Sequence, residues 1–401
     1  MSCQIQHSAA ACQLNLRNGR DQTTAALRAD TAYDLYADQG HPRNREPERF
    51  EMIDRPRLST SDRPRPDARP WQAAALFLAV AALVAVLWPW RDVPRDALAA
   101  WTGHRPLAHV RSWHYQLDAV TVESMAKRDV DMLVTDYARE GGKIPLSAED
   151  VAQLKVKPDG GRRVVIAYLS IGEAEEYRFY WKDAWTAAKP DFLVRENCAW
   201  PKAWMVRYWD PGWRDLIISG PDAYLKRIIR AGFDGVYLDR VDMWENTRAL
   251  NPQARAAMIE FVADLAATAR RLKPGFIVIA QNAEDLLEDR GYRRTIDAVA
   301  KEELLFSKTA TGGRNTGEDV RESLHHLNWM LWQWKPVFPV EYLLKADDIA
   351  VARTEERTLG LVPVFPTRAL DGGDPTAPLE LKDQIGTPEF IKDKCPAGTA
   401  W

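Results

Sequence analysis

Eight short β-rich runs alternate with helical stretches in the C-terminal part of this chain, and this alternation restricts the fold more than any other feature. The runs are 112–118, 132–138, 164–171, 233–239, 276–282, 296–302, 336–342 and 361–366. Helical patterns fill most of the gaps, over 121–128, 147–155, 213–231, 253–272, 284–290, 318–330 and 346–358. The alternation predicts an α/β fold, a (β/α)8 TIM barrel over 109–370. A doubly wound parallel sheet is the alternative, although no GxGxxG or GxxxxGK[ST] motif supports a nucleotide-binding version.

The composition fits a globular protein that does not hold nucleic acid. Apolar residues make up 46% of the 401 residues and charged residues 28%, which is enough to bury a core. The 54 basic residues are balanced by 57 acidic ones, so no excess of positive charge is available for a phosphate backbone.

Cysteine and histidine usage predicts neither a metal site nor a cofactor. The four cysteines form no CxxC motif, and the seven histidines are scattered except for one adjacent pair. If the body is exported, Cys198 and Cys395 are its only thiols, and we expect a disulfide between them. Two free thiols are the alternative.

The N-terminal region predicts targeting rather than a folded domain. Residues 1–70 are polar and Arg-Pro-rich, which is typical of disorder, and form either a cytoplasmic region or an untranslated leader that ends at a start on Met52. Residues 71–90 are apolar, which predicts a transmembrane signal anchor in the inner membrane. A cleaved signal peptide and a buried globular helix are the alternatives. Arginines precede this segment, so we expect the N-terminus in the cytoplasm and the body in the periplasm, outside the cell, or secreted after cleavage.

Three segments lie outside the repeating pattern. Residues 91–108 are expected to be a linker, and 371–401, punctuated by Pro and Gly, a C-terminal tail packed on the barrel. The stretch 172–212 is long for one strand-to-helix connection, so we expect it to fold over the barrel mouth, with 204–206 as an additional strand.

The strand-like runs repeatedly finish on a polar residue. These residues are Asp118, Asp136, Ser170, Asp239, Asn282, Glu302 and Tyr342. In a (β/α)8 barrel, the C-terminal strand ends form the mouth where active sites lie. The pattern therefore predicts an acidic active site there.

Asp239 and Glu302 are the candidate catalytic pair. Strand alternation that sends Val236 and Leu238 toward the helices sends Asp239 into the barrel. Glu302 ends the sixth run in the same way, although the neighbouring Glu303 could be the inward residue. Two carboxylates that converge on one cleft are what glycoside hydrolysis requires. The alternatives are a helix cap at Asp239, a salt bridge from Asp239 to Arg240, or a structural ion-pair network of the two acids.

Side chains near the two acids suggest two further interpretations of this site. Lys301 could form a Schiff base with a carbonyl substrate, but the alternation that turns Glu302 inward turns Lys301 outward. Aromatic residues in the same loops could stack on the apolar faces of sugars, or could simply pack. These residues are Trp113, Tyr177, Tyr180, Trp181, Trp204, Trp209 and Trp244.

Three segments, 168–178, 208–214 and 232–239, together resemble the endo-α-1,4-polygalactosaminidase family of glycoside hydrolases. The resemblance covers about 109–370 and is to the bacterial branch, once labelled cysteinyl-tRNA synthetase-related; the sequence has no KMSKS-like segment, so we reject an aminoacylation role. The resemblance implies a (β/α)8 barrel, with Asp239 as nucleophile or base and Glu302 as general acid. Lys301 and Arg240 depart from the residues that fungal members carry beside these two acids.

The expected function is therefore hydrolysis of an α-linked, galactosamine-type polysaccharide, by a retaining mechanism rather than an inverting one. A non-catalytic polysaccharide-binding or biofilm-matrix protein on a TIM-barrel scaffold is the alternative. The side chains expected to bind substrate are Asp136, Tyr168, Glu173, Arg178, Trp209, Tyr237, Asp242, Gln281, Asn282, Glu303 and Tyr342.

Overall fold

The computed structural model describes residues 105–306, 313–377 and 388–396. The predicted leader (1–70) and apolar segment (71–90), and most of the predicted linker, lie outside these residues. Within the described ranges, no helix has both the length and the apolar character needed to cross a membrane.

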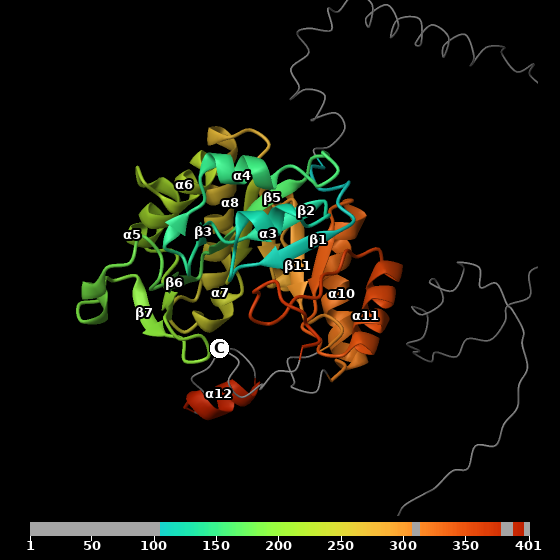
Figure 1. Ribbon diagram of the computed structural model, residues 1–401. Coiled ribbons are helices and arrows are strands. Elements are labelled where there is room, and N and C mark those ends of the chain that lie inside the picture. The colour runs from blue at the N-terminus through green and yellow to red at the C-terminus, as the bar shows by residue number, and fades with distance from the viewer. Residues whose placement is uncertain (1–104, 307–312, 378–387, 397–401) are drawn as a thin grey trace, which may run out of the picture. The chain divides into compact units, whose positions relative to one another are not determined.

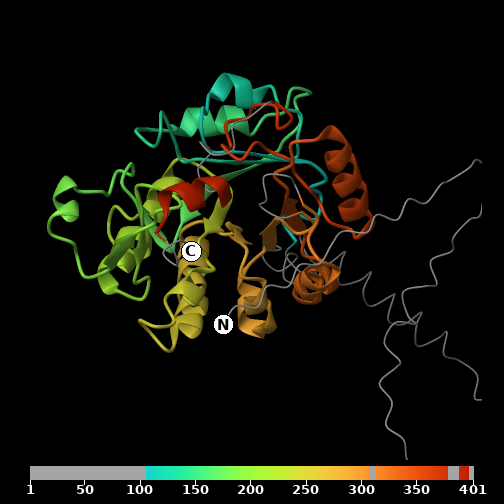
Figure 2. The same cartoon turned by 90° about the horizontal axis from the view of Figure 1, so that it is seen from below.

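A curled parallel sheet of seven strands forms the centre of the body (Figures 1 and 2). The strands are β1 (Trp113–Gln116), β2 (Met132–Thr135), β5 (Val164–Ser170), β9 (Gly235–Asp239), β10 (Ile277–Gln281), β11 (Ala298–Glu302) and β12 (Val337–Val340). Each strand pairs with the next in chain order. A doubly wound sheet reverses its strand order at a switch point, so that alternative is wrong. Seven of the eight predicted strands are present.

The eighth predicted run, 361–366, lies beside β12 but forms only an isolated bridge, between Val340 and Val364. Val362 N donates to Val337 O at 3.0 Å, and Val364 N donates to Pro339 O at 2.9 Å. On its other side, Trp113 Nε1 donates to Val362 O at 2.8 Å. Pro363 and Pro366 have no N–H to donate, which limits the ladder that this run can form. The result is a TIM-like half-barrel of seven strands.

Helices lie around the outside of this sheet (Figure 2). They are α3 (Val122–Ala126), α4 (Ala148–Leu154), α5 (Pro211–Arg214), α6 (Tyr224–Arg230), α7 (Met243–Asn246), α8 (Ala254–Leu272), α9 (Arg290–Thr295), α10 (Gly317–Trp332) and α11 (Ala346–Thr358). Short 3₁₀ segments are η1 (Asp183–Thr186) and η3 (Glu284–Glu288), and a π-turn, η2 (Asp215–Ser219), follows α5. The single helix expected over 213–231 is wrong, because Gly220 and Pro221 separate η2 from α6.

Strand alternation separates the core into two clusters. Tyr237, Ile279 and Ala300 belong to the cluster inside the sheet, whereas Val236 and Leu238 belong to the cluster between the sheet and the helices. A Cβ on Gly235 would lie 2.4 Å from Ile277 O, so only glycine allows this close pairing of β9 with β10. The predicted alternation at β9 is therefore confirmed.

The long connection after β5 folds as an antiparallel sheet of three strands. They are β6 (Glu173–Glu175), β7 (Leu193–Glu196) and β8 (Ala203–Val206), in the order β6-β8-β7. The additional strand expected at 204–206 is thus present. A two-stranded pair, β3 (Ala138–Arg139) and β4 (Ile144–Pro145), follows β2.

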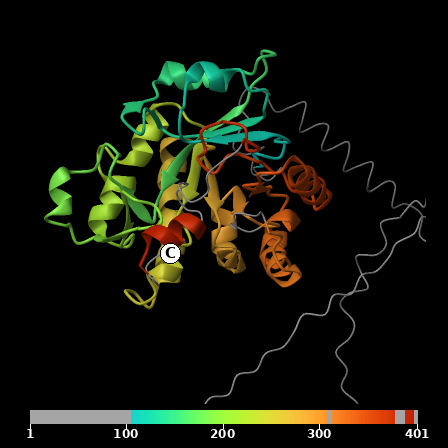
Figure 3. The ribbon, with the colours of Figure 1, turned by 60° about the horizontal axis from the view of Figure 1, so that its bottom comes forward.

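A disulfide joins the inserted sheet to the C-terminal tail. Cys198, between β7 and β8, bonds Cys395, just after α12 (Pro388–Lys394), with Cα atoms 5.3 Å apart. Figure 3 shows α12 in red, beside the inserted strands. Nearer the sheet, Leu117 N donates to Leu370 O at 2.8 Å, which holds the start of the tail against the end of β1.

Two buried carboxyl groups, Glu341 after β12 and Glu356 on α11, lie together outside the mouth. Both residues are fully buried, and Glu341 Oε1 accepts a hydrogen bond from Leu305 N at 2.7 Å. Burial, and then the charge of Glu341, raises the pKa of Glu356 to about 10, and a protonated Glu356 donates to Glu341. Burial also raises the pKa of Glu341 to about 7. The pair joins α11 to the sheet through a shared proton.

Because the folded-state pKa of Glu356 lies above its ordinary value of 4.5, this group favours the folded state most at low pH. Its contribution is lost as the pH rises from about 4.5 toward about 10, because the unfolded chain has released this proton and the folded chain still holds it. Glu356→Gln should therefore gain stability relative to wild type as the pH rises from 5 to 9. Urea unfolding at both pH values measures this, and a stability difference that does not change with pH would contradict it.

Candidate active site

The two predicted catalytic acids are the last residues of two strands that lie one strand apart in the sheet. Asp239 is the last residue of β9 and Glu302 the last of β11, with β10 between these strands. Asp239 Oδ2 accepts a hydrogen bond from Tyr168 Oη at 2.6 Å, and its Oδ1 accepts from Arg240 N at 2.7 Å. The predicted helix cap at Asp239 is wrong, since Asp242 is the residue that precedes α7.

Hydrogen bonds hold the Glu302 side chain in place as well. Its Oε1 accepts a hydrogen bond from Tyr342 Oη at 2.5 Å, and its Oε2 accepts from Asn282 Nδ2 at 2.9 Å. Asn282 Oδ1 in turn accepts from Glu302 N at 3.0 Å, so one amide side chain holds both the backbone and the carboxylate. Tyr168, Asn282 and Tyr342, all predicted site residues, thus contact the acid pair directly.

The two carboxylates interact electrostatically. Burial, and after it the negative charge of Glu302, raises the pKa of Asp239 to about 7. The charge of Arg240 and the hydrogen bond from Tyr168 oppose this rise. Burial is the larger cause, so Asp239 holds its proton to a higher pH than an ordinary aspartate does.

Left-handed backbone conformations follow three successive strands at the mouth. Arg240 after β9, Asn282 after β10 and Glu303 after β11 have φ values of 60°, 56° and 55°. None is glycine, and such strain gathers at functional sites. At Arg240 the turn aims the backbone N–H at Asp239, and at Asn282 it accompanies the contact with Glu302.

Aromatic side chains form the floor below the acids. The rings of Tyr115 and Tyr237 lie 5.1 Å apart, and those of Trp113 and Phe338 lie 5.4 Å apart. Burial raises the pKa of Tyr237 well above 10, and the charges of Glu302 and Asp239 add to this. The Tyr237 hydroxyl therefore stays neutral beneath the carboxylates.

Asp136 and Arg178 form a buried ionic network with Glu175, next to Tyr168. Arg178 Nη1 donates to both carboxylate oxygens of Asp136, at 2.7 and 2.8 Å, and Nε donates to Glu175 Oε2 at 2.5 Å. The guanidinium carbon lies 5.8 Å from the ring centre of Tyr168. The network joins the end of β2 to the inserted sheet and supports the tyrosine that bonds Asp239.

Glu173 and Asp242 flank Arg240. Glu173 Oε1 accepts from Asn197 Nδ2 at 2.9 Å and lies 3.4 Å from Arg240 Nε. Asp242 Oδ2 lies 3.8 Å from Arg240 Nη1. Both predicted acids thus lie beside the cation that follows Asp239.

Glu303 and Lys301 take different directions from Glu302. Glu303 pairs with Arg368, whose guanidinium lies 4.3 Å from the ring centre of Tyr342. Lys301 Nζ lies 3.1 Å from Glu284 Oε1 on η3, toward the helices. Glu302 is therefore the residue of the three whose charge acts on Asp239, while Lys301 is paired with Glu284.

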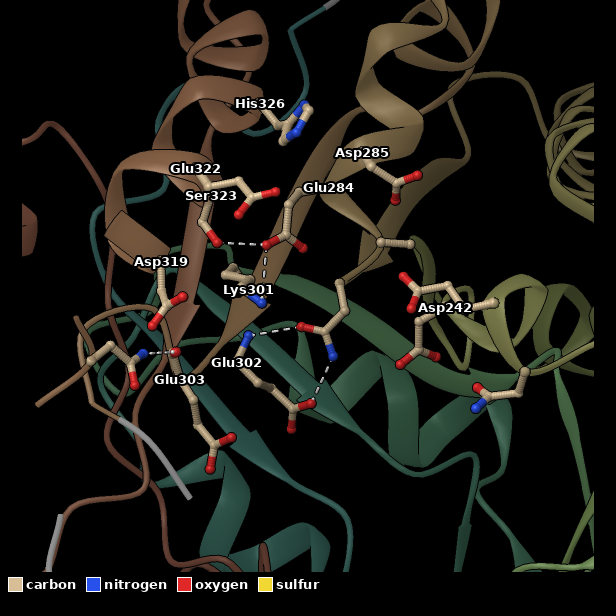
Figure 4. A pocket seen from close by; sticks show the side chains of 15 residues that line it. Asp242, Glu284, Asp285, Lys301, Glu302, Glu303, Asp319, Glu322, Ser323 and His326 are labelled. Carbon is tan, nitrogen blue, oxygen red and sulfur yellow. Dashed lines mark hydrogen bonds and ion pairs between the residues drawn. The ribbon is translucent and has the colours of Figure 1, made fainter. Parts of the chain in front are cut away.

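An acidic cleft extends from Glu302 toward η3 and α10 (Figure 4). Its volume is about 730 Å³. Eight acidic side chains line it, against one lysine and one histidine, Lys301 and His326. The acids are Asp242, Glu245, Glu284, Asp285, Glu302, Glu303, Asp319 and Glu322. Within it, Ser323 Oγ donates to Glu284 Oε1 at 2.7 Å.

Of the eleven predicted binding residues, Asp242, Asn282 and Glu303 line this cleft, and the other eight do not. Trp209 packs edge-on against Tyr208, with ring centres 5.0 Å apart, and against the outer core. Gln281 is buried at the end of β10. Of the predicted aromatic platforms, Trp181 and Trp204 pack together in the insertion, with ring centres 5.9 Å apart. Among the described residues, no group of histidine, cysteine or acidic side chains could hold a metal ion.

Sequence reasoning missed Arg368 and the acids on η3 and α10, and it did not count Arg240 among the site residues. Arg240 directly follows Asp239, and Arg368 follows the last strand-like run. The rule that polar residues at strand ends mark the mouth could therefore have found both. Glu284, Asp319 and Glu322 belong to helical segments, and no strand pattern points to them. Their convergence depends on how η3 and α10 pack outside β11.

A curled parallel sheet with a coupled carboxyl pair at its C-terminal edge is an arrangement that defines a class of glycoside hydrolases. The model of glycoside-hydrolase family GH114 matches residues 93–379. The chain belongs to this family, the endo-α-1,4-polygalactosaminidase family, which confirms the resemblance found in its sequence.

Relatives in distant organisms share the same region. An uncharacterised protein of Deinococcus radiodurans is 35% identical over 270 residues, which are 66% of this chain and 83% of that protein. One of Thermotoga maritima is 34% identical over 243 residues, 59% of this chain and 72% of that protein. Among solved structures, the glycoside hydrolase domain of PelA from Pseudomonas aeruginosa is 22% identical, with a TM-score of 0.49, and the match covers 65% of this chain and 96% of that one.

Replacing Arg178 by methionine should strongly destabilise the fold, because Asp136 and Glu175 would remain buried without their cation. Loss of one partner from a buried ion pair costs about 3–5 kcal/mol. The matched control is Lys127→Met, which breaks the exposed pair with Glu123 and should cost about 1 kcal/mol or less. Denaturant unfolding compares the two, and equal losses would contradict the structural role assigned to Arg178.

Proposed function

We propose that this protein hydrolyses an α-linked amino-sugar polysaccharide of the galactosamine type, with Asp239 as nucleophile or base and Glu302 as general acid. The observation that carries the proposal is that Asp239 and Glu302 end strands at one edge of the sheet and interact electrostatically, since glycoside hydrolysis needs two carboxyl groups at one site. Membership of GH114 gives the reaction class.

The position of the two acids relative to the cleft supports this division of roles, whereas the raised pKa of Asp239 would by itself suit the general acid. Glu302 lines the open cleft, so its proton can reach the oxygen of a leaving sugar that extends into that cleft. Asp239 is held on the other side by Tyr168 and Arg240 N, a fixed position suited to attack on the anomeric carbon. In a retaining reaction, Asp239 forms a glycosyl ester as Glu302 protonates the leaving oxygen. Glu302 then takes a proton from the water that cleaves the ester.

The acidic cleft supports a positively charged substrate. Opposite charges a few ångströms apart attract, and a cleft lined by one sign of charge raises the local concentration of a ligand of the other sign. Free amino groups on the sugars would bring that positive charge, and phosphorylated or uronic polymers would be repelled. The cleft therefore favours a polymer in which part of the amino groups are not acetylated.

We propose the same exported location that the sequence predicts, with the body outside the cytoplasm. The support is the disulfide between Cys198 and Cys395, since disulfides persist chiefly in oxidising compartments.

Asp239→Asn and Glu302→Gln should each lower hydrolysis by several orders of magnitude while the fold remains intact, because each removes one member of the acid–base pair. Reducing-end release from partly deacetylated galactosamine and glucosamine polymers measures the effect, with circular dichroism to check folding. Wild-type protein that binds these polymers without releasing reducing ends would favour the non-catalytic alternative. A folded variant with undiminished activity would refute the assigned role.

Removing the negative charge of Glu322, on the α10 side of the cleft, should weaken the binding of a positively charged polymer only. One exposed charge contributes about 1 kcal/mol or less, so Glu322→Gln should raise KM about two- to fivefold for a deacetylated polymer. For a fully acetylated polymer KM should not change. The matched control is Glu318→Gln, an exposed acid on the same helix α10 outside the cleft lining. Equal effects of both variants on both polymers would argue against a charge-selecting cleft.

A further inference from the structure

The face of the body opposite the mouth carries different exposed side chains from the mouth. Parallel strands end at the mouth, and the helices between them run back in the opposite direction. The C-terminal ends of α4, α8, α10 and α11 therefore gather at the other end of the sheet, which we call the basal face. In Figure 1 the inserted strands and α12 lie at the lower side of the body, so the basal face is the upper side.

Exposed apolar side chains mark the ends of these four helices. Trp332 is the last residue of α10, and Trp332 and Trp334 are 68% and 70% exposed, the largest exposed fractions among the exposed large apolar side chains of the described residues. The others at this face are Val156 after α4, Leu272 at the end of α8 and Leu359 after α11. One exposed apolar side chain is ordinary, but two neighbouring tryptophans at one helix end form a projecting patch.

Cations accompany these tryptophans. The Arg105 guanidinium carbon lies 5.5 Å from the ring centre of Trp334. Arg293, which is buried and bonded to Leu287 O and Glu288 O, lies under the patch, 4.7 Å from the ring centre of Trp329, which contacts Trp332 at 5.2 Å. The patch is therefore aromatic and basic together.

Exposed arginines continue this pattern around the basal face. Arg271, Arg294 and Arg357 lie in the last turns of α8, α9 and α11 and are exposed. A cation at a helix C-terminus is favoured by the helix dipole alone, and Arg270 nearby pairs with Asp297. Acids lie at this face too: Asp129 and Asp131 pair with Lys157, and Asp159 is exposed in the loop after α4. The basal face thus carries several arginines beside apolar side chains, whereas the cleft at the mouth is acidic.

We infer that the basal face binds an anionic lipid surface, with Trp332 and Trp334 at the level of the headgroups. Tryptophan is favoured at membrane interfaces because its ring is apolar while its N–H bonds water, and arginine is attracted to anionic headgroups. A cationic amino-sugar polymer is a poorer match, since these arginines would repel it.

The position of Arg105 and the apolar sequence before it also favour a lipid surface at the basal face. Arg105, the first described residue, contacts the patch, so the described chain begins at the basal face. In the sequence, residues 73–88 carry no charge, and the 17 residues from there to Arg105 span at most about 60 Å. A body bound in this way would direct its acidic mouth away from the lipid. The inference does not depend on the reaction at the mouth.

The test places an environment-sensitive fluorophore on the full chain at Trp332→Cys, in a background with Cys3→Ser and Cys12→Ser and the native disulfide left oxidised. The matched control is Leu250→Cys, an exposed apolar position in the loop between α7 and α8, on the mouth side. Each protein is mixed with vesicles of phosphatidylcholine containing one third phosphatidylglycerol, with and without spin-labelled lipids.

We expect a blue shift and severalfold stronger quenching by the spin-labelled lipids at position 332 than at position 250. Both effects should weaken when Trp334→Ser is added, and should be much smaller in pure phosphatidylcholine vesicles. Equal signals at the two positions would overturn the inference. So would a probe at position 332 that responds to galactosamine polymer but not to vesicles, since that result assigns the patch to polysaccharide.

Discussion

The mutual repulsion of Asp239 and Glu302 is the interaction on which the rest of the site depends. Burial, and after it the charge of Glu302, raises the pKa of Asp239 to about 7. The charges of Arg240 and Asp242 and the hydrogen bond from Tyr168 also act on this pKa. Tyr168 and Arg240 favour the charged form of Asp239, and Tyr342 and Asn282 hold Glu302 in a fixed orientation.

The order of the strands brings the two acids to the same edge of the sheet. Because β9, β10 and β11 are neighbours and parallel, residues that end them meet at one edge. Asn282, between the two acids, bonds Glu302 and separates the pair with a neutral amide. The buried network of Asp136, Arg178 and Glu175 fixes the inserted sheet against Tyr168, so an element far from the acids in sequence shapes their environment.

Much of this could be predicted from the sequence because period-two alternation and polar strand ends are local signals. They identified seven strands, the inward direction of Asp239, and Tyr342 as a residue of the mouth. They failed where the result depends on packing between distant segments. The run 361–366 looks like a strand, but its two prolines limit pairing to a bridge with β12. The acids of η3 and α10 meet Glu302 only through the packing of helices on β11. The pairing of Glu341 with Glu356 likewise has no local signature.

The most direct test of the account is the titration of the Asp239 carboxyl by carbon-13 NMR, in wild type and in Glu302→Gln. The account predicts an apparent pKa near 7 in wild type, and a clear fall when the neighbouring charge is removed. Asp242, whose charge also acts on Asp239, would remain in both proteins. An Asp239 pKa near its ordinary value of 3.8 in wild type, or one that Glu302→Gln leaves unchanged, would contradict the coupled pair.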